Sequence, residues 1–237
     1  RTTYFSNMSD WNPAEMIGNN PKPLAISLYK ELITNSIWAE QRSNYGYKNV
    51  KPNHLLINLG GSPHIDLRTD INSFLPAELD RKIQEKLTNF FLKKLNNKKF
   101  LHDKIEFDVV PTTFEPDLNK KTENILNNTE IKDYKKSLKI LTNKFFENEN
   151  KILNTELNKI YQLDEIINKF NKSNLSEIQK IFFLIQECKQ KGTLPFAGLA
   201  RCAFVGNSIL RIFVKKDILK KKDYSDLYES FFNIPKL

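Results

Sequence analysis

No glycine occurs between Pro116 and Gly192, and this long stretch constrains the second half of the chain to helices. Within residues 131–170 the apolar side chains recur at intervals of three and four residues: Tyr134, Leu138, Leu141, Phe145, Leu153, Leu157, Ile160 and Ile167. This spacing places them on one face of an α-helix. The repeat changes phase at "ENEN" (147–150), where we expect a bend. The phase change favours a helical arm packed on its own domain over an intermolecular coiled coil.

Two further helices are predicted toward the C-terminus. The first covers 176–191, with Ser176 as its N-cap and Gly192 just past its end. The second begins at about Pro195 and is apolar on nearly every side, so we expect it to be buried in the middle of the protein.

The first half of the chain mixes helices with short strands. Helical spacing predicts helices over 23–42 and 78–95, and the run "GGSP" (60–63) between two extended segments predicts a β-hairpin. Alternating residues in "KIEFDVV" (104–110) predict a third strand. The expected fold class is α+β and predominantly α-helical, with a small antiparallel sheet and long helices. Strands and helices do not alternate eight times, so a TIM barrel is excluded. We expect a pocket-forming α+β part at 1–116 and a helical part packed on it at 117–237.

The composition limits the classes of partner. The formal net charge is +9 and the pI about 9.3, but only six of the 37 basic residues are arginines, and no basic cluster forms a nucleic-acid footprint. No apolar run approaches a membrane span and no signal peptide precedes the first helix, so a cytoplasmic protein without membrane or nucleic-acid partners is expected. Cys188 and Cys202 are expected to be reduced thiols.

Arg201 carries the strongest physical constraint in the chain. It lies among Leu199, Ala200, Cys202 and Ala203, and a guanidinium in such surroundings needs an anionic partner. A salt bridge to Asp10, Glu15 or another acid and the binding of a phosphate or carboxylate are both compatible with the pattern.

Other polar residues suggest a pocket in the first half. Trp38 lies one helical turn before Arg42, so either the two line a pocket or the tryptophan is core and the arginine reaches solvent. On the predicted hairpin, His64, Asp66 and Arg68 share one face, where Asp66 and Arg68 are also spaced to pair with each other. The small polar residues that follow most often make turns: Asp70, Asn72 and Ser73.

Four stretches together resemble the middle region of phosphoenolpyruvate-synthase-like phosphohistidine kinases. They are "MSDWNPAEMIG", "PKPLAISLYKELITNSIWAEQRSNYGY", "IDLRTDINSFLP" and "GTLPFAGLARCAFVGNSILR", within residues 8–211. The resemblance is closest to the branch that phosphorylates L-glutamine for capsular phosphoramidate. In this family an ATP-grasp domain phosphorylates a histidine on a mobile domain, which then delivers the phosphoryl group to an acceptor on a third domain. The chain lacks the ATP-grasp elements, and "GGSPHI" departs from the Gly-Gly-x-x-Ser-His motif, so the resemblance implies the acceptor-binding domain alone.

The resemblance also implies roles for particular residues. ATP and Mg²⁺ would serve the full enzyme, with ATP held outside this domain. Arg42, Arg68 and Arg201 would neutralise phosphate or carboxylate oxygens in the transfer. The expected substrate-binding residues are Asp10, Asn12, Glu15, Trp38, Asp66 and Asn72. Asp10 and Glu15 are metal candidates, and Asn12 would read a side-chain amide. Another small acceptor such as pyruvate, or a non-catalytic helical interaction module, remain alternatives.

Overall fold

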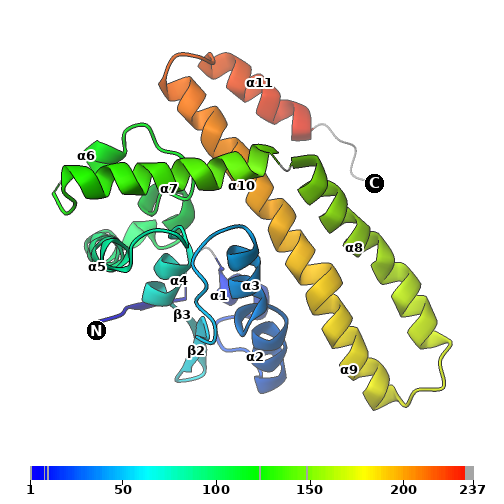
Figure 1. Ribbon diagram of the computed structural model, residues 1–237. Helices are drawn as coiled ribbons and strands as arrows, with labels where there is room; N and C mark the ends of the chain where they lie inside the picture. Colours follow the sequence, from blue (N-terminus) through cyan, green and yellow to red (C-terminus); the bar gives the residue numbers. More distant parts are fainter. Residues whose placement is uncertain (1, 8, 10, 123, 148, 233–237) are drawn as a thin grey trace.

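The computed structural model describes residues 2–7, 9, 11–122, 124–147 and 149–232. It confirms an α+β fold that is predominantly helical, with a small antiparallel sheet (Figure 1). The helices of the first half are α1 (Pro13–Ile17), α2 (Pro23–Tyr29), α3 (Ile37–Asn44), α4 (Leu67–Ser73) and α5 (Arg81–Asn97). Those of the second half are α6 (Leu118–Thr122), α7 (Asn128–Glu147), α8 (Glu149–Asn171), α9 (Glu177–Glu187), α10 (Leu194–Lys215) and α11 (Lys221–Phe232).

The sheet is built on the predicted hairpin. Strands β2 (Leu56–Leu59) and β3 (Ser62–Asp66) pair in antiparallel register, with Leu59 opposite Ser62. Gly60 and Gly61 make the two-residue turn with φ of 59° and 89°, a conformation that glycine adopts without strain. Strand β1 (Phe5–Ser6) adds to the other edge of β3, giving the order β1-β3-β2.

One part of the hairpin prediction was wrong. Strand β3 ends at Asp66, and Arg68 lies in α4 rather than on the strand face. Asp66 is the N-cap of α4, where its carboxylate accepts from the backbone N–H groups of Arg68 and Thr69 at 2.9 and 3.2 Å. The capping bonds start a helix one residue after the strand, because a carboxylate at this position satisfies amides that would otherwise be unpaired.

The predicted third strand was also wrong. Residues Ile105–Val109 form a single π-helical turn, in which Ile105, Glu106 and Val109 are buried while Phe107 is half-exposed. The alternation of polar and apolar residues had placed Glu106 on the polar face of a strand. In the structure Glu106 is buried, where it pairs with Arg201 of α10. Similarly, the helix predicted over 23–42 is divided into α2 and α3 by a π-helical segment at Lys30–Thr34.

The hydrophobic core lies between the sheet and helices α3, α4, α5 and α7. Its fully buried side chains include Trp38, Leu55, Ile65, Leu67, Ile71, Phe74, Leu87, Phe91 and Tyr134. The apolar residues whose spacing of three and four predicted α5 and α7 therefore lie on the buried faces of these helices.

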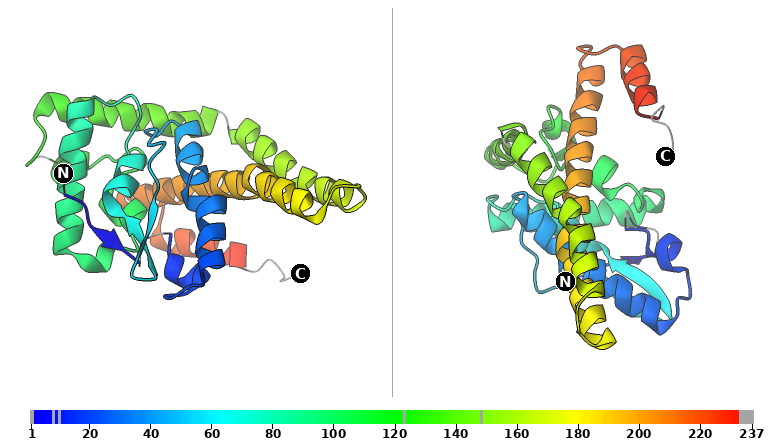
Figure 2. Two further views of the ribbon diagram at one scale, coloured as in Figure 1. Left: turned by 90° about the horizontal axis from the view of Figure 1, so that it is seen from below. Right: turned by 90° about the vertical axis from the view of Figure 1, so that its right-hand side faces the viewer.

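The predicted bend is confirmed, because α7, which ends at Glu147, and α8, which begins at Glu149, run in different directions (Figures 1 and 2). Helices α8 and α9 run side by side as a hairpin that projects from the body of the protein (Figures 1 and 2). Ser176 caps α9 as expected, through a capping box with Gln179. Gly192 does not end that helix, since a π-helical segment at Cys188–Thr193 carries it directly into α10.

The burial expected for α10 is only partly found. Leu194, Pro195, Gly198, Arg201 and Val205 are buried along one stripe that packs on α3 and α8. Phe196 is 70% exposed, and Phe182 on α9 is 57% exposed. Along the described chain, the continuous helix Glu177–Lys215 is also the one helix that is long and apolar enough to cross a membrane by length and composition; 17% of its apolar window is buried.

Candidate functional site

Arg201 is buried in a salt bridge with Glu106. Both side chains are about 95% buried, at 4% and 5% exposure, and both guanidinium Nη atoms bond to the carboxylate, Nη2 to Oε2 at 3.0 Å. Burial is the largest single effect and would lower the pKa of Arg201, but Glu106 and Tyr47 together raise that pKa above its usual value. The acid that pairs with Arg201 is thus Glu106, one of the other acids that the sequence left open, rather than Glu15.

Arg42 lies beside this ion pair. Its guanidinium carbon is 3.6 Å from the centroid of the Phe74 ring, and that of Arg201 is 5.5 Å from the same centroid. Arg42 Nη1 donates to the hydroxyl of Ser73 at 3.0 Å, and the side chain is fully enclosed. Burial, followed by the positive charge of Arg201, lowers the pKa of Arg42 to about 10. The structure therefore brings two of the three predicted catalytic arginines together around one phenyl ring.

Asp70 supplies the second negative charge of the cluster. The side chain is fully buried on α4, three residues before Ser73, and accepts from the indole Nε1 of Trp11 at 3.0 Å. Burial raises the pKa of Asp70 to about 6, against the opposing effects of Arg42 and of the Trp11 hydrogen bond. When all four groups are ionised, the charges of Arg42, Asp70, Arg201 and Glu106 sum to zero, which favours their enclosure together.

Several hydrogen-bonding atoms of this cluster have no partner among the described residues. They are Nε of Arg42, Oδ2 of Asp70, Nε of Arg201, and Nε1 of Trp38, whose ring packs on that of Trp11. Native proteins pair nearly all buried polar atoms, so these unpaired donors and acceptors are candidates to bind a polar ligand.

The two tryptophans form one wall of the cluster. The rings of Trp11 and Trp38 meet edge to face, with centroids 6.2 Å apart and planes at 82°. Trp11 also lies 5.4 Å from the guanidinium carbon of Arg42, and its backbone carbonyl accepts from the hydroxyl of Tyr29 at 2.9 Å. Trp38 is 1% exposed and is therefore part of the hydrophobic core, and its contact with Trp11 also makes it part of the wall.

The remaining predicted residues are divided between other places. Arg68 and Asn72 lie one helical turn apart on the face of α4 that packs toward α5, away from Asp70 and Ser73. Asn12 precedes α1 with a positive φ of 35° and is half-buried, and Glu15 is exposed in α1. Asp10 lies outside the described residues. Asp66 is occupied as the α4 cap.

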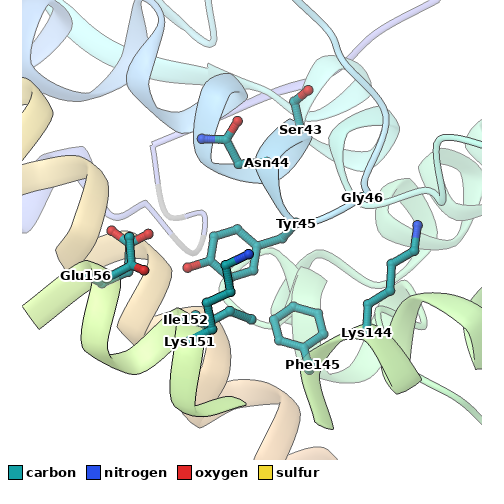
Figure 3. A pocket seen from close by; sticks show the side chains of 10 residues that line it. Ser43, Asn44, Tyr45, Gly46, Lys144, Phe145, Lys151, Ile152 and Glu156 are labelled. Atoms are coloured by element: carbon teal, nitrogen blue, oxygen red, sulfur yellow. The ribbon is translucent and has the colours of Figure 1, made fainter. Parts of the chain in front are cut away.

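An open cavity adjoins the cluster on the side of Tyr45. It has a volume of about 500 Å³ and lies between the loop after α3, the end of α7 and the start of α8 (Figure 3). Tyr45 stacks on Phe145 with centroids 5.4 Å apart, and Figure 3 shows its hydroxyl directed toward Glu156, across the cavity from Lys144. Burial and the charge of Glu156 raise the pKa of Tyr45, whereas nearby Arg201 lowers it, so the phenol lies between cavity and cluster.

The two acids of the site were missed by the sequence reading. Asp70 was expected only to form a turn, although Leu67, Ile71 and Phe74 around it on a helix would have indicated burial. Glu106 was assigned to the polar face of a strand. In the described part of the chain, no three His, Cys, Asp or Glu side chains are grouped to hold a metal ion. Neither a protein-family model, nor a curated protein, nor a solved structure matches this chain.

Proposed function

We propose that this chain is the acceptor-binding domain of an ATP-dependent phosphohistidine kinase whose acceptor is L-glutamine. The resemblance of four stretches to phosphoenolpyruvate-synthase-like kinases supplies the reaction. The observation that carries the proposal is the buried pair of Arg42 and Asp70, each with a hydrogen-bonding atom unpaired within the described chain. A buried arginine and a buried carboxylate are complementary to the α-carboxylate and α-ammonium groups of an amino acid.

In the proposed complex with the acceptor, each charged side chain of the cluster has its own role. Arg42 binds the carboxylate of the acceptor and Asp70 its ammonium group, while Arg201, held by Glu106, offers its unpaired Nε–H to the incoming phosphoryl oxygens. The side-chain amide of the acceptor has Gln41 and Asn12 as hydrogen-bonding candidates. Trp11 covers the site through its contacts with Asp70 and Arg42.

The other components of the reaction belong to other domains. An ATP-grasp domain and a phosphohistidine domain of the same enzyme would use ATP and Mg²⁺ and act in the cytoplasm. The 237-residue chain alone is therefore expected to bind the acceptor without forming AMP from ATP. Formation of AMP by a pure sample, lost on changing a residue of this chain, would contradict that assignment.

Intrinsic fluorescence offers a direct test, because the chain contains two tryptophans and both border the cluster. Titration with L-glutamine should give a saturable change that persists in Trp38→Phe and disappears in Trp11→Phe if Trp11 reports the bound acceptor. Pyruvate and L-glutamate serve as competing acceptors. A saturable response to pyruvate and none to L-glutamine would assign the site to another acceptor of the same reaction.

A non-catalytic interaction module is the second candidate. It is favoured by the exposed apolar side chains on α9 and α10, with Ile178 at 80% and Phe196 at 70% exposure. In that case the arginines only join the two halves of the chain. The fluorescence of both tryptophan variants would then be unchanged by every acceptor, and Arg42→Lys would lower stability alone.

A further inference from the structure

A second polar hollow lies on the outer face of α4, between that helix and α5. It has a volume of about 90 Å³ and is lined by Lys48, Arg68, Asn72, Arg81, Glu85 and Thr88. Asp70 and Ser73, which belong to the buried cluster, lie on the opposite side of α4. The hollow is therefore separate from the proposed acceptor site and needs no assumption about it.

Two of its cations are held in place by the protein. Asn72 donates to the backbone carbonyl of Arg68 at 2.9 Å and accepts from the ammonium group of Lys48 at 2.9 Å. Arg68 donates through Nε to the carbonyl of Thr2 and through Nη2 to Oδ1 of Asn89 at 2.8 Å, which fixes the plane of its guanidinium. Fixed donors lose less entropy when a ligand binds than mobile ones do.

The lining carries an excess of positive charge. Lys48, Arg68 and Arg81 contribute three cations against the single carboxylate of Glu85. Like charges around so small a hollow repel one another, and an anion placed among them relieves that repulsion. Arg81 makes no hydrogen bond within the described part of the chain, so its guanidinium donors are available to a ligand.

We propose that this hollow binds the phosphate group of a phosphate monoester. The volume is about three times the roughly 30 Å³ that one water occupies in the liquid, which suits a phosphate group but leaves the rest of a ligand outside. A phosphate carries about two negative charges at neutral pH and matches the three cations better than a carboxylate does. The forked donors of two arginines fit its tetrahedral oxygens.

Titration calorimetry at low ionic strength, with inorganic phosphate and with glycerol 3-phosphate, tests the proposal on the whole chain. Saturable binding of both at one site per chain is expected. Arg81→Met should weaken it by about fivefold or more, as the loss of one ionic contact implies. Lys82→Met removes the same charge from the next residue of α5, which points away from the hollow, and should leave the affinity unchanged within about twofold.

Three outcomes would overturn the proposal. They are the absence of saturable binding, an equal weakening in Arg81→Met and Lys82→Met, and binding of inorganic phosphate without glycerol 3-phosphate. Arg68→Met provides a second variant, and circular dichroism confirms that each variant is folded. An excess of L-glutamine should not displace the phosphate, because the acceptor site lies on the other side of α4; displacement would mean that the two are one site.

Discussion

Trp11 donates its indole N–H to Oδ1 of Asp70 at 3.0 Å, although the two residues are 59 positions apart in the chain. The bond ties the polar segment before α1 to the buried face of α4. Oδ2 of the same carboxylate has no partner within the described chain, and Arg42 is close enough to influence its ionisation. The first polar segment of the chain therefore reaches the charged interior through the side chain of Trp11.

The buried state of Asp70 predicts a pH dependence of stability. Its pKa is about 6 in the folded protein and near 3.8 without the fold, so the folded state holds the proton more tightly. Well below pH 3.8 both states are protonated and there is no penalty; of the total cost of about 3 kcal/mol, which is complete only above pH 7, the native state loses about 2 kcal/mol as the pH rises from 4 to 6. We expect the stability difference between Asp70→Asn and the native chain to shift by that amount over this window, in favour of the variant.

Urea denaturation at each pH measures this difference. Asp164→Asn, which changes an exposed acid of α8, is the matched control and should follow the native chain at every pH. A difference between Asp70→Asn and the native chain that stays constant from pH 4 to 7 would show that the carboxyl group has an ordinary pKa.

The Arg201–Glu106 pair should behave as one unit. Removing one partner leaves a buried charge uncompensated, so Arg201→Met and Glu106→Gln should each lower the free energy of unfolding by about 3–5 kcal/mol. The loss of unfolding free energy in the double variant should be much smaller than the sum of the two single losses. The difference, which is the coupling energy of the pair, should be about 2 kcal/mol or more. The exposed pair of Lys51 and Glu40 is the control, with an expected coupling below about 1 kcal/mol. Additive losses at Arg201 and Glu106 would contradict the ion pair.

The packing of α10 on Tyr45 predicts opposite effects at two glycines of that helix. A Cβ at Gly198 would lie 2.4 Å from the Tyr45 hydroxyl oxygen, whereas a Cβ at Gly206 would meet nothing within 4 Å. Gly198→Ala should destabilise the protein by about 1–3 kcal/mol through overpacking, and Tyr45→Phe in the same chain should restore much of this loss. Gly206→Ala should stabilise by up to about 1 kcal/mol through helix propensity. Equal effects at both positions would refute the contact.

Local patterns were sufficient for most of the fold. The apolar stripes of α5 and α7, the phase change before α8 and the glycine turn of the hairpin each depend on residues a few positions apart, and each prediction was confirmed. The failures occurred where distant residues decide the structure. The turn at Ile105–Val109 forms around Glu106, whose partner Arg201 lies 95 positions away. Gly192 did not end its helix. It lies in the π-helical segment Cys188–Thr193, which packs on α8 and continues directly into α10.

The candidate site was only half predictable for the same reason. Arg201 could be selected because apolar residues surround it in the sequence, and Arg42 because Trp38 lies one helical turn before it. Their acids could not be selected, because Asp70 and Glu106 become partners only after the chain folds. Arg68 was expected on the face of a strand and Asn72 at the exit of that strand, but Asp66 begins a helix there and turns both residues toward α5.

Calorimetric titration of L-glutamine into the 237-residue chain tests the central claim most directly. We expect binding of one L-glutamine per chain, weakened by about tenfold or more in Arg42→Lys and in Asp70→Asn, each of which removes one member of the pair that reads the amino acid. Asp164→Asn should bind like the native chain. Binding of L-glutamine with native affinity by folded Arg42→Lys and Asp70→Asn, or no binding by the native chain, would contradict the account.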